Sequence, residues 1–260
     1  MKVLITGGTG SLGQELAGHF SDVTIFSRNE ANQVEMRSKY PHCKYLIGDV
    51  RDSDQVMAAV KGHDYVFHLA ALKHIDICET QPDEAVKTNI VGTMNMVNAC
   101  SQNGVKLVNM SSDKAINATS IYGMTKFIGE KIASDYVSIR SGNILWSSGS
   151  VLPLWRDQLE KKNTIRITDK RMTRFFVHPA DLARYIISSK DEKGIKTTPM
   201  LSFNLYEIAV KFVELFGNSD SKIIETGMRP GERLHEYRDK ETSSEHNICT
   251  DLNYIFDVNI

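Results

Sequence analysis

The sequence lacks long hydrophobic runs, and its few cysteines show no metal-binding spacing. No apolar run approaches the ~20 residues of a membrane-spanning helix, and the short apolar stretch at residues 1–10, MKVLITGGTG, breaks at glycines. We therefore expect neither a membrane span nor a signal peptide. The four cysteines are scattered without C-x-x-C spacing. This pattern argues against a zinc site and favours reduced thiols in a cytoplasmic protein.

An excess of charge of one sign is also missing. The chain carries 31 lysines and arginines against 32 aspartates and glutamates, for a net charge of -1. This balance provides no bulk attraction to nucleic acid or to an anionic membrane, so neither is expected as a partner. With 260 residues and 41% hydrophobic content, the chain can form one large domain, or one domain with a small lobe.

Short apolar segments alternate with segments of helical spacing over the first half of the chain. Strands that are apolar throughout are typical of a parallel sheet covered on both faces. The pattern predicts an α/β fold with a doubly wound parallel sheet, of the Rossmann type. The expected strands are 2–8, 22–28, 43–49, 64–71, 105–112 and 137–143, and the expected helices are 11–20, 33–40, 53–62, 83–104 and 121–136.

Polar residues and glycines mark the ends of two of these helices. Ser53 or Asp54 is the expected N-cap of the helix that ends before Gly62. Gly104 is expected to end the long helix that begins at residue 83.

The regular alternation weakens after residue 143. Glycine, serine, proline and arginine become more frequent in segments 143–155, 171–183 and 227–236, which we interpret as loops and small helices. We expect an NADP-binding Rossmann domain over 1–142 and a mainly substrate-binding C-terminal lobe over 143–260. Part of that lobe, around 176–200, is expected to return to the Rossmann domain. The last segment, 247–260, shows no assignable pattern.

A glycine-rich turn, TGGTGSLG, joins the first expected strand to the first helix. Glycines at such a turn let backbone N–H groups and the helix N-terminus approach a pyrophosphate. The pattern is weak alone but specific at the start of an α/β chain, so it predicts dinucleotide binding rather than an ordinary turn. The residues expected at the cofactor here are Gly7, Thr9, Gly10, Ser11, Leu12 and Gly13.

The ends of the second and third strands bear on the choice of cofactor. An NAD site usually has an acidic residue after the second strand, for the ribose 2′-hydroxyl. Here Ser27 and Arg28 occupy that place, which favours NADP because a guanidinium and a hydroxyl suit a 2′-phosphate. Glu30 keeps NAD open as the less favoured cofactor. Asp49 and Val50 are expected near the adenine, or they form only a strand-to-helix turn.

Tyr122 and Lys126 are spaced i, i+4 and share one face of an expected helix. A phenol with an ordinary pKa of ~10 is a poor base at neutral pH. A neighbouring ammonium and a positive nicotinamide ring would lower that pKa, so Tyr122 could take a proton from a sugar hydroxyl. The spacing is common on helices, but here it follows the glycine turn and a strand that ends in Ser111 and Ser112.

The glycine turn, HLAA and the Y-x-x-x-K spacing resemble the extended short-chain dehydrogenase/reductases. Five longer segments are similar to the inverting UDP-N-acetylglucosamine 4,6-dehydratases of the polysaccharide biosynthesis family. They lie in family order over nearly the whole chain, at 70–93, 111–126, 140–155, 167–177 and 227–236. The chain looks shorter than the family between 136 and 137 and at its C-terminus.

The resemblance implies roles for the adjacent residues Asp113 and Lys114. Tyr122 would start oxidation at C4 of the sugar, Lys114 would remove the C5 proton, and Asp113 would protonate the departing O6. Related hexose dehydratases usually carry Asp-Glu here, so the lysine points to the type that inverts C5. A base lysine must be partly neutral, which desolvation or the charge of Lys126 would favour. Ser112 either hydrogen-bonds the C4 hydroxyl or only caps the turn.

A UDP-sugar substrate needs cationic and amide-like partners. The substrate-binding residues implied by the resemblance are Lys73, Asn143, Val151, Arg174, Arg229 and Glu232. Ala70, Ala71 and Lys73 follow the fourth strand, where ligands bind in such sheets, and are expected at the cofactor. His74 is expected to be a loop residue, and His178 is expected to have a structural role.

The resemblance implies a homo-oligomer and an enzyme of surface glycan biosynthesis. Two alternatives to the dehydratase remain open. One is a nucleotide-sugar 4-epimerase or reductase, which needs no acid–base pair for elimination. The other is a non-catalytic NADP-binding sensor, although such proteins often lack the tyrosine or the lysine that this chain retains.

Overall fold

A seven-stranded parallel sheet forms the larger part of the protein, in a computed structural model that describes residues 1–256. Its strand order is β10-β6-β5-β4-β1-β2-β3. The strands are β1 (Lys2–Thr6), β2 (Asp22–Ser27), β3 (Lys44–Ile47), β4 (Tyr65–His68), β5 (Lys106–Met110), β6 (Val137–Arg140) and β10 (Gly194–Thr197). Every neighbouring pair runs parallel. The predicted doubly wound α/β sheet is therefore confirmed.

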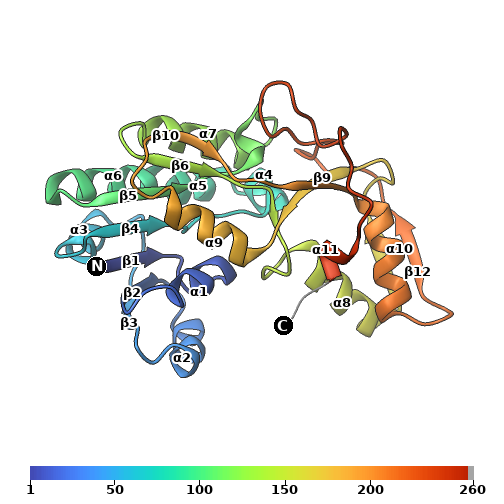
Figure 1. The fold of residues 1–260 in the computed structure, drawn as a ribbon, viewed down its shortest axis with the longest axis horizontal. Helices are drawn as coiled ribbons and strands as arrows, with labels where there is room; N and C mark the ends of the chain where they lie inside the picture. The colour runs from blue at the N-terminus through green and yellow to red at the C-terminus, as the bar shows by residue number, and fades with distance from the viewer. Residues whose placement is uncertain (257–260) are drawn as a thin grey trace.

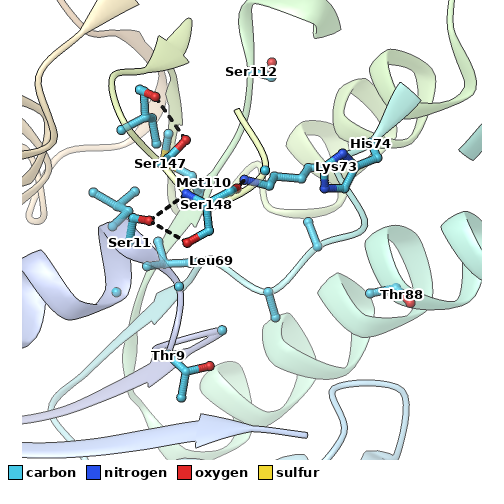
Figure 2. A pocket seen from close by; sticks show the side chains of 18 of the residues that line it. Thr9, Ser11, Leu69, Lys73, His74, Thr88, Met110, Ser112, Ser147 and Ser148 are labelled. Atoms are coloured by element: carbon cyan, nitrogen blue, oxygen red, sulfur yellow. Dashed lines mark hydrogen bonds between the residues drawn. The ribbon is translucent and has the colours of Figure 1, made fainter. Parts of the chain in front are cut away.

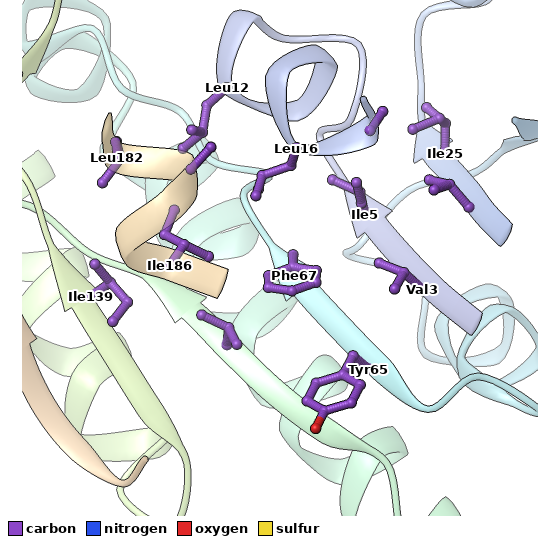
Figure 3. Close-up of a cluster of buried hydrophobic side chains, with 14 of the residues drawn as sticks. Val3, Ile5, Leu12, Leu16, Ile25, Tyr65, Phe67, Ile139, Leu182 and Ile186 are labelled. Carbon is purple, nitrogen blue, oxygen red and sulfur yellow. The ribbon is translucent and has the colours of Figure 1, made fainter. Parts of the chain in front are cut away.

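Successive residues of a strand point to opposite faces of the sheet, and in the central strands β1, β2 and β4 both sets are buried. Val3 and Ile5 of β1 belong to a cluster with α1 (Ser11–Ala17) and α9 (Pro179–Ser188), shown in Figure 3. Leu4 between them packs on the other face, against α3 (Ser53–Val60) and α6 (Gly92–Asn103). This two-sided burial explains why the strands read as unbroken apolar runs.

Helices cover the sheet as Figure 1 shows, with α2 (Glu30–Lys39) beyond β3 and α7 (Ile121–Ile132) beside β6. The N-cap of α3 is Asp52, whose carboxylate accepts hydrogen bonds from the backbone of Asp54 and Gln55. The expected cap at Ser53 or Asp54 was wrong, because the last extended residue before the helix is Asp52.

The long helix expected over 83–104 is not uniform. It follows α4 (Ile75–Thr80) and consists of α5 (Pro82–Ala85), a π-helical segment η1 (Val86–Val91) and α6. Gly104 ends α6 in the left-handed conformation, as predicted. The π-helical segment lies beside the cavity described below, which Thr88 lines. Such segments are frequent at functional sites.

The second half of the chain is more regular than the sequence suggested. It contains a three-stranded sheet of β7 (Asn143–Ile144), β9 (Thr173–Val177) and β11 (Leu201–Asn204), and a two-stranded sheet of β8 (Thr164–Ile167) and β12 (Lys222–Glu225). Its helices are α8 (Val151–Lys162), α10 (Leu205–Phe216) and α11 (Asn253–Phe256). Loops and small helices were expected over 143–155 and 171–183, and the twelve-residue helix α8 and the strand β9 correct that expectation.

An aromatic cluster holds these small-lobe elements together. Phe212 of α10 packs against Trp155 of α8, with ring centroids 5.7 Å apart, while Phe176 and Phe203 pair across β9 and β11. These side chains come from segments far apart in the chain, so no local sequence pattern predicts that they pack together. Burial of this cluster stabilises the helices more than local propensity does.

The chain returns to the large sheet after β9. The strand β10 pairs with β6, and α9 packs against α1. The division into 1–142 and 143–260 stays a prediction, and residues 257–260 lie outside the described residues. Over residues 1–256, no helix combines the length and the apolar content that a membrane crossing requires.

We predict that Phe212→Ala destabilises the protein by about 3–5 kcal/mol, because it leaves a cavity in the aromatic cluster. Phe212 is fully buried, whereas Leu215 on the same helix is 50% exposed. Leu215→Ala is the matched control and should change the free energy of unfolding little. Chemical denaturation measures both variants, and equal losses would contradict this account of the small-lobe core.

Candidate active site

The candidate site lies where the order of strands in the sheet reverses. The strand β1 has β2 on one side and β4 on the other, and ligands in such folds bind beyond the carboxyl ends of these strands. A cavity of about 520 Å³ is found there. Its wall includes the glycine turn, the residues after β4, the start of α7 and segment 147–150.

The glycine turn brings the start of α1 against the sheet. Gly7 has a φ of +64°, and a Cβ there would lie 2.8 Å from the backbone nitrogen of Ala70. A Cβ on Gly13 would lie 2.5 Å from the backbone of Gly8. The cradle therefore leaves no room for side chains, and it exposes backbone N–H groups at a helix N-terminus, as a pyrophosphate requires.

All six glycine-turn residues predicted at the cofactor line the cavity, and so do Ala70, Ala71 and Val50. Ser27 and Arg28 line it at the end of β2. Asp49 does not. Its carboxylate is held by Arg51, with an Oδ2–Nη2 distance of 2.6 Å, and lies 3.8 Å from Nη1 of Arg28. Burial opposes the charge of Asp49, but the hydrogen bonds from Arg51 hold its pKa below the usual value.

The start of α7 fixes the reactive end of the cavity. Ser120 caps this helix by accepting a hydrogen bond from the backbone N–H of Gly123. A Cβ on Gly123 would lie 2.2 Å from the carbonyl oxygen of Lys114, so the helix rests directly on the turn η2 (Asp113–Ala115). This contact places Tyr122 and Lys126 near Lys114, and all three line the cavity together with Ser112.

Burial governs the pKa values of these groups. Burial raises the pKa of Tyr122, although the charge of Lys114 and the hydroxyl of Ser112 act in the opposite direction. The sequence argument expected the pKa of Tyr122 to be lowered, and the protein's own groups do not lower it. Burial lowers the pKa of Lys126 to about 8, against the opposing charge of Glu130.

Asp113 and Lys114 form a buried ion pair. Asp113 is fully buried behind the cavity wall, and its Oδ1 accepts hydrogen bonds from Lys114 Nζ and from Ser112 Oγ, both at 3.0 Å. Burial favours the neutral lysine, but the carboxylates of Asp113 and Glu236 outweigh it and raise the pKa of Lys114. The sequence argument expected desolvation or the charge of Lys126 to favour a partly neutral lysine. In this arrangement the charges of Asp113 and, second, of Glu236 favour the ammonium instead.

Lys73 also lines the cavity, where it holds segment 147–150 in place. Its Nζ donates to the carbonyl of Ser148 at 2.7 Å, and the backbone N–H of Ser148 donates to Ser11 Oγ at 3.0 Å. Figure 2 shows these bonds, with His74 beside Lys73. Burial lowers the pKa of Lys73. Asn143 lines the cavity as well, whereas Val151 lies just beyond its wall at the start of α8.

Besides Val151, three predicted substrate residues do not reach the cavity wall in the described part of the chain. Arg174 is buried and donates to the backbone carbonyls of Thr173, Arg233 and Leu234. Arg229 and Glu232 form an ion pair with a distance of 2.6 Å. Their assignment to the substrate stays a prediction. The expected structural position of His178 is seen at the start of α9, where its ring donates to the carbonyl of Tyr254.

Sequence reasoning missed three buried titratable groups around the site. His68 lies between Thr6 and Thr93, and burial lowers its pKa to about 3, which keeps it neutral. Glu130 is clamped by Arg140 through two hydrogen bonds of 2.7 Å.

The third group is Glu236, whose Oε1 lies 3.8 Å from Lys114 Nζ. It belongs to segment 227–236, which resembles the family, but only its contact with Lys114 distinguishes it from the other charged residues there. Within residues 1–256, no group of three or more His, Cys, Asp or Glu side chains could hold a metal ion.

Residues 3–258 match the polysaccharide biosynthesis protein family. The chain belongs to this family. The resemblance found in its motifs, to extended short-chain dehydrogenase/reductases of the polysaccharide biosynthesis family, is thereby confirmed.

Two relatives of this chain carry names of different activities. An inverting UDP-N-acetylglucosamine 4,6-dehydratase of Campylobacter jejuni is 37% identical over 259 residues, which cover 90% of this chain and 76% of that protein. A UDP-glucose 4-epimerase of Rickettsia bellii is 35% identical over 260 residues, with the same coverage. The X-ray structure of Pen from Bacillus thuringiensis is 35% identical, covers 91% of this chain and 83% of that one, and superposes with a TM-score of 0.87.

We predict that Gly13→Ala weakens binding of a nicotinamide dinucleotide, NAD or NADP, about tenfold or more, because the added Cβ would push α1 away from the turn. Gly18→Ala is the control, since its Cβ would meet nothing closer than 3.4 Å. Titration calorimetry with NADP compares the two variants. Unchanged affinity for Gly13→Ala would exclude the glycine turn as the pyrophosphate cradle.

Proposed function

We propose that this protein catalyses NADP-dependent 4,6-dehydration of UDP-N-acetylglucosamine with inversion at C5. The product would be a 4-keto-6-deoxy UDP-sugar for surface glycan biosynthesis. The observation that carries the proposal is the buried pair of Asp113 and Lys114 at the end of the cavity that also holds Tyr122 and Lys126. The name of the Campylobacter relative supports the same reaction.

The residues present fit a bound NADP. The crowded glycine turn would hold the pyrophosphate, and Ser27 and Arg28 would hold the 2′-phosphate at the other end of the cavity. When bound, NADP would supply a nicotinamide that accepts a hydride from C4 of the sugar and returns it to C6. Lys73 and Asn143 remain the proposed substrate contacts on the cavity wall.

Tyr122 would take the proton of the C4 hydroxyl, with Ser112 as a hydrogen-bond partner of the same group. The pair of Asp113 and Lys114 shares one proton across a 3.0 Å hydrogen bond. When that proton lies on Asp113, the pair consists of a carboxylic acid and a free amine. The amine would then remove the C5 proton while the acid protonates the departing O6 hydroxyl, which leaves as water.

The second candidate is a nucleotide-sugar 4-epimerase or reductase, favoured by the Rickettsia relative at 35% identity. An epimerase needs Tyr122 and the cofactor but no base at C5. A non-catalytic NADP-binding sensor is less well supported, because Tyr122 and Lys126 both line the cavity.

The predicted homo-oligomer is part of this proposal. Exposed apolar residues on the neighbouring helices α6 and α7, namely Met94, Met124, Phe127 and Ile128, favour a contact with a second copy. The cytoplasmic location stays a prediction.

Incubation with UDP-N-acetylglucosamine in deuterated water tests the reaction. We expect deuterium at C5 of a 4-keto-6-deoxy product with inverted configuration, read by NMR. Lys114→Ala should abolish this elimination, because no base then reaches C5, while NADP still binds.

Lys161 is an exposed lysine on α8, and Lys161→Ala is the matched control, which should convert the substrate at the normal rate. Unchanged turnover by Lys114→Ala would refute the role given to this lysine. A 4-epimer without deuterium at C5 would favour the second candidate instead.

The cofactor preference has its own test. We predict that Arg28→Ala weakens binding of NADP about tenfold and of NAD little, since only NADP carries the 2′-phosphate. Arg37→Ala removes the same charge from α2, where Arg37 stacks on Tyr45 away from the cavity, and should affect neither cofactor. Equal losses for NADP and NAD in Arg28→Ala would count against the 2′-phosphate site.

A further inference from the structure

Glu236 lies beside Lys114, which lines the cavity, although the two residues are 122 positions apart in the sequence. It lies in the segment after β12, coloured orange to red in Figure 1, which passes from the small lobe alongside β9. Hydrogen bonds join this segment to β9, including one from the backbone N–H of Thr173 to the carbonyl of Leu234. Glu236 is 2% exposed. A carboxylate this far from water requires a partner or a function.

Several contacts fix the position of Glu236. Its backbone N–H donates to Ser244 Oγ at 2.8 Å, and its carbonyl accepts from the Ser244 N–H at 2.7 Å. Arg174 binds the carbonyls of Arg233 and Leu234 just before it. Arg233 donates to the carbonyl of Ile116, three residues beyond Asp113, and so ties the segment to the turn of the catalytic pair.

The side chain of Glu236 is aimed at Lys114 but is incompletely paired. Its Oε1 lies 3.8 Å from Lys114 Nζ, beyond hydrogen-bond length. Its Oε2 is buried and makes no hydrogen bond to any described residue, and the same holds for Oδ2 of Asp113. Two buried carboxylates thus face one ammonium, and each has an oxygen without a hydrogen bond, although Oε2 of Glu236 also lies 3.8 Å from Nη1 of Arg233.

We propose that Glu236 is a positioning residue that controls the charge of Lys114. This inference rests on the proposed dehydration, in which Lys114 acts as a free amine. Ionised Glu236 would hold Lys114 as an ammonium between two anions. Protonated Glu236 would leave Asp113 as the only anionic partner, so the shared proton could pass from Lys114 to Asp113. No proton is created or lost, because Glu236 takes its own from solvent.

The other charged groups around Lys114 fit this arrangement. Arg174, on β9, disfavours the ammonium of Lys114. Both Arg174 and Arg233, which lies in the segment after β12, favour ionised Glu236. Tyr122 faces Lys114 from α7. Burial nevertheless raises the pKa of Glu236, which brings its protonated form closer to neutral pH. The charge of Lys114 should therefore depend on Glu236 more than on any group outside the pair.

NMR of the lysine side chain tests the proposal without needing turnover. Protein labelled with ¹³C at lysine Cε is titrated with NADP present, and the Lys114 signal is identified by its loss in Lys114→Met. In Glu236→Gln, which keeps the shape but not the charge, the Lys114 midpoint should fall by about one to two pH units. In the same variant, the rise of elimination rate with pH should move downward by a similar amount.

Two controls separate charge from structure. Glu245→Gln removes a charge from the same segment, where Glu245 pairs with His235, and should leave the Lys114 midpoint unchanged. Glu236→Asp keeps the charge and should hold the midpoint near that of the unaltered protein. If Glu236→Gln does not fold, the unaltered protein still decides, since a Lys114 midpoint at or below that of ordinary lysine overturns the proposal.

The outcomes distinguish the two proposals. A lowered Lys114 midpoint without any dehydration would uphold the role of Glu236 in setting the charge and reject the reaction. Dehydration with the same Lys114 midpoint in Glu236→Gln as in the unaltered protein would uphold the reaction and reject the role of Glu236.

Discussion

The burial of the Lys114 ammonium between two carboxylates is the constraint on which the candidate site depends. A charge taken out of water is costly unless oppositely charged groups surround it. Asp113, which directly precedes Lys114 in the sequence, provides one such group, and Glu236 in the segment after β12 provides the other. The arginines that tie this segment to β9 and to the turn after Asp113 are therefore part of the site, although neither of them contacts the cavity.

The two ends of the cavity, one at the glycine turn and one at Tyr122 and Lys126, are built differently. The cofactor end is built on rigid backbone: crowded glycines, a helix start and strand ends in register. The reactive end is built from side chains whose charges are adjusted by burial, with Tyr122 shifted upward and Lys126 downward in pKa. Segment 147–150 connects the two, because Ser148 bonds both Ser11 and Lys73. Membership of the polysaccharide biosynthesis protein family agrees with this combination but does not choose between dehydratase and epimerase.

Much of the large sheet could be predicted because its signals are local. Central strands buried on both faces are mostly apolar, and Gly104 ends a helix in the left-handed conformation, which glycine adopts more easily than other residues do. The small lobe was less predictable. Trp155 and Phe212 stabilise α8 and α10 by packing against each other, although they are 57 positions apart in the sequence. Neither helix therefore carries a complete signal of its own.

The sequence by itself determined which chemical groups are available: a glycine turn, a phenol four residues from an amine, and an adjacent acid and lysine. Those patterns depend on spacing along one segment, which is fixed before the chain folds. Only the tertiary structure decided the charge of Lys114, the neutrality of His68 and the position of Arg174 away from the cavity wall. Each of these depends on burial and on partners tens of residues away, and neither quantity exists in the unfolded chain.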